Sequence, residues 1–466
     1  MALSKMSSSI VGRSDAYKYS HWRLYPPGMR YMQSYFEARG GKYRNVITFG
    51  LQYLLTEYLE GIRVTRRDID RNKARIISSM GPRVWNDAGW EHLLEAHGGR
   101  LPLLIKALPE GTRTGHGIPL LTVENTDPKL GWLTNFVETI LLDWYPTTVA
   151  SQQYAKRVMM LDFLNRTGTP ANIDWMWQDF GYRGSTTQES AMLAGAAHLL
   201  SFSGSDTHPA NEFIEEYYGG IGENGTVSGS VPASEHSTVT SWGREREAEA
   251  ARNMLTVYPT GPVSNVSDSY DFEAACSEIY GSILRDQILR RDGVFVVRPD
   301  SGDPEGVVRR GFEILADKFG CEYNDKGYKV INPKVRLLQG DGIHYESAYS
   351  LLASIEHNRW SVDNLACLGE GGGIHQKCDR DTLNMAIKAC AVDIDGKWFD
   401  VFKDPKGSPN KSSKRGRLAV MQDEYGFRFI QENALYTDNA LETVFKNGEI
   451  TQRFTWPEIR QRALAA

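Results

Sequence analysis

The stretch GVFVVRPDSGDPEGVVRRGFEILADKF (293–319) joins a short apolar run to an amphipathic helical pattern through a turn of Pro, Asp, Ser and Gly. The same order of features recurs in residues 261–284, 334–357 and 364–389. Strands of this length that alternate with helices predict a parallel sheet. Several such units in series favour an α/β barrel.

Polar and glycine residues follow the apolar runs directly. They are Asp268, Arg298, Asp300, Asp341 and the glycines 371–373. In α/β barrels the C-terminal ends of the strands carry the chemistry. We therefore expect these residues to lie together at one face of the barrel.

The two ends of the chain have a different pattern of apolar and turn-forming residues. Runs 29–39, 101–111 and 117–127 resemble strands, and residues 49–62 have helical spacing up to Gly61. Residues 392–402, 417–430 and 443–456 each predict a hairpin, with DG and NG as the strongest turn signals. We expect residues 1–150 and 391–466 to form one accessory domain of mixed α and antiparallel β structure, and 151–390 to form the barrel.

Composition excludes several classes of protein. The chain has 466 residues, of which 41% are hydrophobic and 24% charged, as in ordinary globular proteins. A net charge of -5 argues against a nucleic-acid binder, and no apolar run reaches the roughly 18 residues of a membrane span. Five cysteines without a CxxC pair, and a start without a secretory signal, predict a cytoplasmic protein with free thiols.

Two turns suit phosphate or ribose, and each has a simpler explanation. GEGGG (369–373) precedes a helical pattern, so its amides suit a phosphate, but it also fits a plain βα turn. It is neither a GxGxxG nor a P-loop motif. In RPDSGDP (298–304) Arg298 suits a phosphate and Asp300 a ribose, whereas a local ion pair with Asp303 as helix cap explains the same residues.

Three further segments carry candidate chemistry. The basic run 404–417 predicts either a solvated face or a loop that closes over a polyphosphate. His236, flanked by an acid and hydroxyls in SEHS, suits proton transfer or phosphoryl acceptance, or a structural role. In QDFGYRG (178–184) Phe180 is either a core residue or a stacking wall for a planar ring, with Arg183 beside it. The other histidines lack HExxH or similar spacing, so the sequence does not indicate zinc.

Taken in order, these segments resemble the nicotinamide phosphoribosyltransferase family, a branch of the type II phosphoribosyltransferases. The resemblance runs from about residue 15 to 460 through strings such as SYFEAR, LPLLIKALPEG, TVENTDP, DFGYRG, SVPASEHST, RPDSGDP, GGGIHQKCDRD and VFKNG. It implies an irregular α/β barrel with an antiparallel β accessory domain, in a homodimer that shares its active sites. It also implies transfer of phosphoribosyl from phosphoribosyl pyrophosphate to nicotinamide, with Mg2+ and with ATP as a coupled co-substrate.

The resemblance also assigns roles to individual residues. Phe180 and the partner subunit's Tyr17 would sandwich nicotinamide, and Arg183 and Asp206 would bind its amide. Ser264, Arg298, Asp268 and Asp300 would lie around the base, ribose and reacting centre. His236, with Glu235 beside it, would accept phosphate from ATP. The phosphate groups would be held by Arg39, Gly340, Asp341, Gly371, Gly372, Arg380, Lys388, Lys403 and Lys411.

The implied reaction explains these residue types. The pyridine nitrogen carries no proton, so catalysis needs orientation of the ring and neutralisation of pyrophosphate instead of a general base. An ionised Asp206 would accept the amide NH2 of nicotinamide and repel the carboxylate of nicotinate. A nicotinate enzyme or a catalytically silent ligand-binding protein remains an alternative. Glu370 is unexpected in a phosphate-binding turn, where it should weaken anion binding unless it points outward or binds a metal.

Overall fold

The computed structural model describes residues 9–220, 226–406, 412–432 and 438–465. The chain divides into two compact units. The first, here the antiparallel unit, comprises Met1–Ser151, Ile214–Gly220 and Asp379–Ala466. The second, the barrel unit, comprises Gln152–Phe213 and Ile221–Cys378. The expected domain boundary at residue 390 falls inside a strand of the antiparallel unit.

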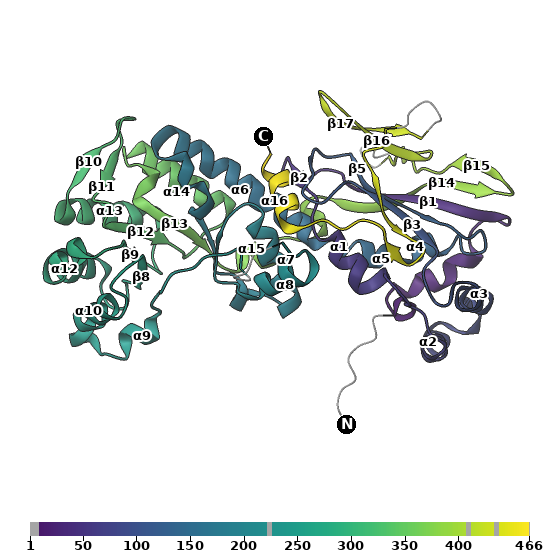
Figure 1. Cartoon of the computed structure of the whole chain (residues 1–466), viewed down its shortest axis with the longest axis horizontal. Coiled ribbons are helices and arrows are strands. Elements are labelled where there is room, and N and C mark those ends of the chain that lie inside the picture. Colours follow the sequence, from purple (N-terminus) through teal and green to yellow (C-terminus); the bar gives the residue numbers. More distant parts are fainter. Residues whose placement is uncertain (1–8, 221–225, 407–411, 433–437, 466) are drawn as a thin grey trace. The chain divides into compact units, whose positions relative to one another are not determined.

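Strands from both ends of the chain form one sheet in the antiparallel unit (Figure 1). All of its neighbouring strands run antiparallel. The order is β15 (Lys397–Asp400), β14 (Met385–Ile394), β1 (Met29–Ala38), β5 (Pro119–Asn125), β3 (Leu103–Ala107), β18 (Glu442–Lys446) and β19 (Glu449–Ile450). Two further pairs are β2 (Val46–Ile47) with β4 (Arg113–Thr114), and β16 (Leu418–Asp423) with β17 (Gly426–Gln431).

The DG and NG turns have the backbone that such dipeptides favour. Asp395 and Gly396, between β14 and β15, have φ of 50° and 88°. Asn447 and Gly448, between β18 and β19, have φ of 53° and 87°. Two successive residues with positive φ make the tight turn whose twist matches a hairpin, so the predicted hairpins are confirmed at these two places.

Helices of the antiparallel unit pack around this sheet. The predicted helix at 49–62 is short: α1 (Leu51–Leu54) widens into a π-helical turn, Leu55–Leu59, before Gly61. The other helices are α2 (Arg66–Met80), α3 (Asp87–His97), α4 (Leu133–Phe136), α5 (Glu138–Leu141) and α16 (Trp456–Leu464). Two helices, α6 (Tyr145–Thr167) and α8 (Pro209–Tyr217), belong in part to each unit.

The barrel unit contains a parallel sheet with the order β7 (Gly204–Ser205), β6 (Trp177–Asp179), β13 (Leu365–Glu370), β12 (Val335–Gln339), β9 (Phe295–Arg298) and β8 (Val263–Val266). An extended segment, 229–234, connects its two edges. The Gly229 N–H donates to the Ser203 carbonyl at 2.8 Å, and the Ser234 N–H donates to the Ser264 carbonyl at 2.9 Å. The sheet thus closes irregularly, which confirms the predicted fold class.

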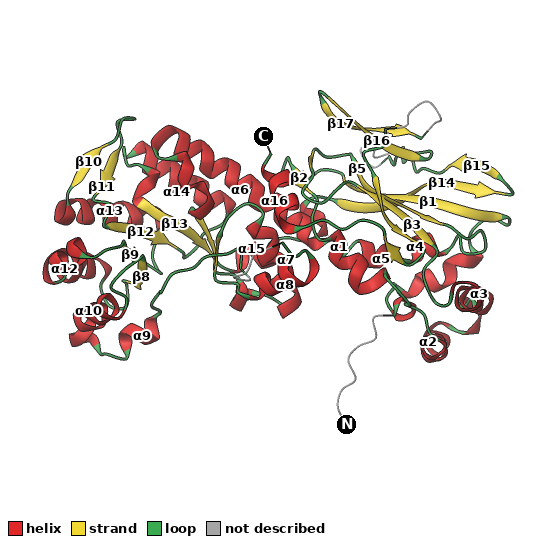
Figure 2. Ribbon diagram, viewed as in Figure 1, coloured by secondary structure: helices red, strands yellow, loops and turns green. Residues whose placement is uncertain are grey.

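Helices cover the outside of this sheet (Figure 2). Asp303 accepts the N–H of Gly306 at 2.9 Å and so caps the helix that begins at Pro304, as its simpler explanation predicted. The helices are α7 (Gln188–Leu199), α9 (His236–Thr240), α10 (Glu247–Val257), α11 (Phe272–Ala274), α12 (Arg285–Arg290), α13 (Pro304–Phe319), α14 (Tyr345–His357) and α15 (Gly372–Gln376). A π-helical stretch follows α11 (Ala275–Ile283), and the ribbon β10 (Cys321–Tyr323) with β11 (Lys329–Ile331) follows α13. Trp177, Phe295, Phe312 and Leu337 belong to the apolar core.

One predicted helix, at 375–389, is wrong. Only α15 is helical there, and the chain passes through a single 3-10 turn, Arg380–Thr382, into β14. Asn384, with φ of 49°, ends any helical continuation. The following residues pair with β1 along its length, so sheet formation overrides the local helical pattern. Within the described part of the chain, no helix has the length and apolarity needed to cross a membrane.

Candidate active site

A cavity of about 650 Å3 opens among the turns that follow the barrel strands. Most of its wall consists of residues that the sequence singled out; Tyr182 and Ser237 were not predicted. The lining residues are Phe180, Tyr182, Arg183, Asp206, Glu235, His236, Ser237, Arg298, Asp300, Gly340 and Gly371. The cavity therefore combines an aromatic ring, both signs of charge and glycine backbone.

A second cavity, of about 390 Å3, shares Phe180, Asp206 and Arg298 with the first. Its remaining wall is largely apolar and includes Val296 and Leu338 from the barrel strands. Ser264 also lines this second cavity. The shared residues thus mark the junction between a polar chamber and an apolar one.

Phe180 is positioned by the strand pairing beneath it. It directly follows β6, and its N–H donates to the Glu370 carbonyl at 2.8 Å. Its ring lies against Gly369: a Cβ built there would come within 2.2 Å of a ring carbon. Gly369 is thus a positioning residue, whereas the sequence predicted for 369–373 either a phosphate-binding turn or a plain βα turn.

Arg183 and Asp206 present opposite charges to the same cavity. Arg183 lies in an exposed turn, and Asp206 follows β7. One carboxylate oxygen of Asp206, Oδ1, accepts hydrogen bonds from Gln178 Nε2 at 3.1 Å and from the Ser230 hydroxyl. Oδ2 has no hydrogen-bond partner among the described residues, so it is available to a ligand.

His236 stands between two carboxylates. Its Nε2 lies 3.1 Å from Asp268 Oδ1, and its Nδ1 lies 3.9 Å from Asp300 Oδ2. The other oxygen of Asp268 accepts the Asp300 N–H at 3.0 Å and the Ser301 hydroxyl at 2.5 Å. The Asp268 side chain is only 7% exposed, whereas 47% of His236 is exposed. Asp268 therefore orients a histidine that remains open to solvent and ligands.

Glu235 and Arg298 complete this side of the cavity. Glu235 caps α9 and accepts the Ser237 hydroxyl at 2.5 Å. Arg298 Nε and Ser264 Oγ are buried without a hydrogen-bond partner within the described ranges. Because a buried polar atom costs free energy when it is unsatisfied, these two atoms indicate places for ligand atoms.

Glu370 does not behave as expected from the sequence. It does not point outward, but lies buried at 1% exposure against the ammonium of Lys156 at 2.5 Å. The Trp177 indole N–H donates to the same carboxylate oxygen at 3.0 Å. Its negative charge is therefore balanced inside the barrel by Lys156, while its other oxygen, Oε1, lies next to Gly373 of the turn.

A buried network ties the Phe180 turn to the glycine turn. His375 Nε2 lies 3.0 Å from Asp179 Oδ1, and His375 Nδ1 lies 2.5 Å from the Ser185 hydroxyl. Burial alone would raise the pKa of Asp179, but the hydrogen bond and charge of His375 lower it to about 2. Neither Ser185 nor the role of His375 was predicted.

The remaining predicted residues lie elsewhere. Asp341 is exposed after β12, and Gly372 begins α15; neither lines the larger cavity. Tyr17, in the antiparallel unit, is 57% exposed and packs edge-on against His21. Lys411 falls outside the described residues.

Four predicted cations of the antiparallel unit are neighbours. Burial lowers the pKa of Lys388, and the positive charges of Arg39, Lys403 and Arg380 lower it further, whereas Glu138 opposes them. Like charges gathered in this way favour binding of an anion. The strand β14 carries Lys388, and Arg39 directly follows β1, its partner strand.

Comparison with known proteins identifies the family. The profile of the nicotinate phosphoribosyltransferase (NAPRTase) family matches residues 175–449, and that of the nicotinamide phosphoribosyltransferase N-terminal domain matches residues 9–105. A nicotinamide phosphoribosyltransferase of Xanthomonas campestris pv. campestris is 42% identical over 98% of both chains. This chain belongs to the nicotinamide phosphoribosyltransferase family. Its resemblance to that family, first drawn from motifs, is thereby confirmed.

Further relatives agree. A nicotinamide phosphoribosyltransferase of Acinetobacter baylyi is 33% identical over 96% of this chain and 95% of its own. Among solved structures, nicotinate-nucleotide pyrophosphorylase from Pyrococcus furiosus aligns with a TM-score of 0.64 over 100% of this chain and 97% of its own, at 15% identity. Human nicotinic acid phosphoribosyltransferase aligns with a TM-score of 0.51 over 97% and 92%, also at 15% identity. These two structures share the fold of this chain.

Proposed function

We propose that this chain transfers the 5-phosphoribosyl group of phosphoribosyl pyrophosphate to the ring nitrogen of nicotinamide, giving nicotinamide mononucleotide and pyrophosphate. The reaction makes it a pentosyltransferase of NAD salvage. The proposal rests on one observation: Phe180, Arg183 and Asp206 line the same cavity. A planar ring, a guanidinium and a carboxylate match the three recognisable features of nicotinamide.

Each of these side chains has a distinct task. The ring of Phe180 stacks on the pyridine, and Arg183 donates to the amide oxygen. Asp206 Oδ2 accepts the amide NH2. Nicotinate would place its own carboxylate against Asp206, and repulsion between like charges in a partly desolvated site rejects it.

The transfer step needs orientation and charge balance. The nicotinamide nitrogen attacks the anomeric carbon with its lone pair while the bond from that carbon to pyrophosphate breaks, so no proton must be removed. Arg298, with its unsatisfied Nε, binds a phosphate or ribose oxygen, and the backbone at Gly371 binds the 5-phosphate. These groups fix the anomeric carbon next to the stacked base.

The donor set also fits Mg2+. This ion prefers one or two carboxylates together with substrate phosphates. Asp300 is 39% exposed at the cavity wall, whereas both oxygens of Asp268 already have partners. We assign Asp300 to the ion, which when bound with phosphoribosyl pyrophosphate would neutralise charge on the pyrophosphate.

His236 is the proposed acceptor of the γ-phosphoryl group of ATP. Asp268 favours the tautomer in which Nε2 carries the proton, which leaves the lone pair on Nδ1. The bond from Nδ1 to phosphorus forms as the bond to the ADP oxygen breaks. The phosphorylated ring adds negative charge and acceptor oxygens at the cavity wall, which is how ATP would stimulate the transfer.

We further propose a homodimer with shared active sites. Tyr17 is exposed, and the cluster of Arg39, Arg380, Lys388 and Lys403 provides the positive charge that a pyrophosphate requires. In this arrangement the antiparallel unit of one chain supplies these groups, with Lys411, to the barrel unit of its partner.

The test is a product assay with phosphoribosyl pyrophosphate, Mg2+ and either nicotinamide or nicotinate, each with and without ATP. We expect mononucleotide from nicotinamide, with ATP stimulation that His236→Ala abolishes. Asp206→Asn should lower kcat/KM for nicotinamide by about tenfold or more, because a hydrogen bond to a charged group contributes roughly 1.5–3 kcal/mol. Asp206→Asn should also reduce the ratio of kcat/KM for nicotinamide to kcat/KM for nicotinate.

Other outcomes identify the alternatives. Product mainly from nicotinate would contradict the role of Asp206 and indicate a nicotinate enzyme. Absence of product from either base, in a folded chain that still binds nicotinamide, would indicate a silent ligand-binding protein.

A further inference from the structure

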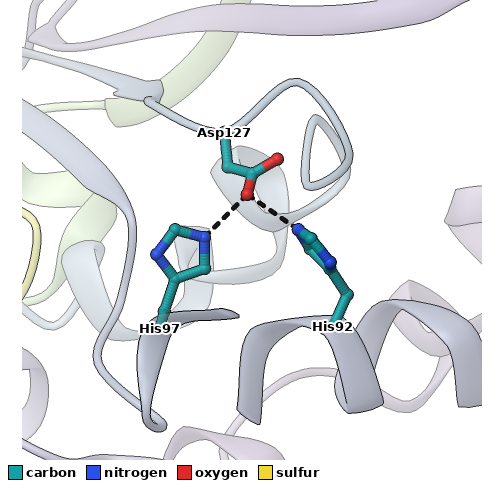
Figure 3. A group of neighbouring side chains, drawn as sticks. All are labelled: His92, His97 and Asp127. Atoms are coloured by element: carbon teal, nitrogen blue, oxygen red, sulfur yellow. Dashed lines mark hydrogen bonds and ion pairs between the residues drawn. The ribbon is translucent and has the colours of Figure 1, made fainter. Parts of the chain in front are cut away.

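Two histidines and an aspartate of the antiparallel unit converge outside the proposed active site (Figure 3). His92 lies within α3, and His97 is the last residue of that helix, before Gly98 in the left-handed conformation. Asp127 follows β5, in the segment TVENTDP. The two imidazoles thus come from the C-terminal half of one helix and the carboxylate from the turn after β5.

The three side chains point their ligand atoms at one place. His92 Nε2 and His97 Nε2 lie 2.8 Å and 2.7 Å from the same atom, Asp127 Oδ2. All three ligand atoms lie within 4.8 Å of one another. An ion with bonds of about 2.0–2.2 Å to such atoms needs only small side-chain shifts to fit between them.

Backbone and side-chain hydrogen bonds fix the orientation of Asp127. Its other oxygen, Oδ1, accepts the backbone N–H of Lys129 at 2.8 Å, and the Asp127 carbonyl accepts Asn125 Nδ2 at 2.7 Å. Hydrogen bonds that fix the ligating group are a regular feature of metal sites.

An ion has access to the cluster. The side chains of His92, His97 and Asp127 are 23%, 26% and 15% exposed. His92 also lines a cavity of about 480 Å3 whose wall includes Pro128, Lys129 and Trp132. The Lys129 ammonium is positively charged, as a metal ion is, so the two neutral imidazoles and the carboxylate must bind the ion strongly enough to overcome this repulsion.

We propose that His92, His97 and Asp127 form a binding site for a divalent transition-metal ion of the Zn2+ type. Two imidazole nitrogens and one carboxylate oxygen suit Zn2+ and its neighbours and do not suit Mg2+, which prefers oxygen ligands. Three protein ligands leave a fourth position for water.

The proposed site would link helix α3 to the turn after strand β5. A bound ion ties the C-terminal end of α3 to the turn after β5, two segments that are otherwise joined here by the Asp127 hydrogen bonds. Because the ion binds the folded arrangement, it stabilises the antiparallel unit by mass action. The spacing HLLEAH matches no metal motif, so only the fold brings the third ligand into place.

The experiment titrates chelator-treated full-length protein with Zn2+ by calorimetry and with Co2+ by visible absorption. We expect one ion per chain, a Co2+ spectrum without a thiolate charge-transfer band, and a Tm that rises with Zn2+. His97→Gln and Asp127→Asn should weaken Zn2+ binding by more than about 100-fold, since even loss of an outer partner costs about 10–100-fold. Mg2+ at the same concentration should not compete.

The matched control is His357→Gln. His357 is likewise the last residue of a helix, α14, and is exposed. This variant should bind Zn2+ as the unaltered chain does. If one variant fails to fold, His92→Gln provides an independent measurement of the same loss. Absence of stoichiometric Zn2+ binding, equal affinity in the variants, or effective competition by Mg2+ would each overturn the proposal.

Discussion

Gly369 shows that a missing side chain can position a neighbouring one. The Phe180 ring occupies the space that a Cβ at this position would need. No left-handed backbone is involved, so the requirement for glycine is steric and comes from a residue far away in the sequence. The site depends on this contact because Phe180 is the proposed stacking surface.

Gly369→Ala should displace the Phe180 ring. We expect KM for nicotinamide to rise about tenfold, because stacking of a base on an aromatic side chain contributes about 1–3 kcal/mol. Steady-state kinetics with nicotinamide as the varied substrate provides the measurement. Gly115→Ala is the control, since no atom lies within 4 Å of a Cβ there. Equal KM values in the two variants would contradict the steric role.

The sequence predicts those site residues that lie in short distinctive strings. Phe180, Arg183 and His236 stand in such strings, and the cavity contains them. Lys156, Ser185 and Gly369 could not be assigned from the sequence, because their roles arise from contacts across the barrel. Glu370 was misjudged for the same reason: nothing in its own segment indicates Lys156.

A buried ion pair joins helix α6 to strand β13. Lys156 and Glu370 are 0% and 1% exposed, and Gln152 Oε1 also accepts from the Lys156 ammonium at 3.0 Å. Such a pair gives little net stability compared with apolar residues, but removal of one partner leaves an isolated buried charge. The pair therefore couples the helix to the start of the glycine turn.

Lys156→Met should lower the free energy of unfolding of the barrel unit by about 3–5 kcal/mol. The double variant Lys156→Met with Glu370→Gln should recover much of this loss, because no buried charge remains. Urea unfolding followed by circular dichroism measures both. Lys397→Met, at an exposed lysine of β15, is the control and should change little. A double variant as unstable as the single one would contradict the assigned role.

The expected helix at 375–389 marks the limit of prediction for elements. Periodicity gave the βα units correctly where the segment folds within its own neighbourhood. It failed where residues after Asn384 pair with β1, more than half the chain away in sequence. Local pattern carries no information about such a partner, which is why β14 could not be predicted.

Each unit buries a titratable group whose pKa is shifted, and the two shifts have opposite consequences for stability. In the barrel unit, burial lowers the pKa of His198 from 6.5 to about 4. In the antiparallel unit, burial raises the pKa of Glu110 from 4.5 to about 7, although N–H groups of Gln52 and Gly50 oppose it. Folding therefore makes His198 harder to protonate and makes Glu110 easier to protonate.

Acidification from pH 7.5 to 4.5 should therefore weaken the barrel unit relative to the antiparallel unit. Below pH 6.5 the unfolded barrel unit gains a proton at His198 that the folded unit does not, so its stability falls until about pH 4. Between pH 7 and 4.5 the folded antiparallel unit keeps a proton on Glu110 that the unfolded unit lacks, so its stability rises. Each effect reaches about 3 kcal/mol.

Hydrogen exchange, corrected for the intrinsic pH dependence, measures the two units separately. His198→Gln should remove the acid-dependent loss in the barrel unit, because the amide still donates to the Gly204 carbonyl that His198 Nε2 reaches at 2.9 Å. Glu110→Gln should remove the gain in the antiparallel unit. If the stability of both units changed with pH in the same direction in the unaltered chain, this prediction would be contradicted.

The arrangement of the large antiparallel sheet has a consequence for synthesis on the ribosome. Strands β1, β3 and β5 emerge early, but β14, which pairs with the whole of β1, emerges only after the barrel unit has been made. At roughly 5–20 residues per second this interval lasts on the order of tens of seconds. During this interval β1, which is largely buried in the finished fold, has no partner along the edge that β14 later occupies. Other nascent chains can pair with this open edge. A chaperone that covers this edge would serve the newly made protein more than the finished one.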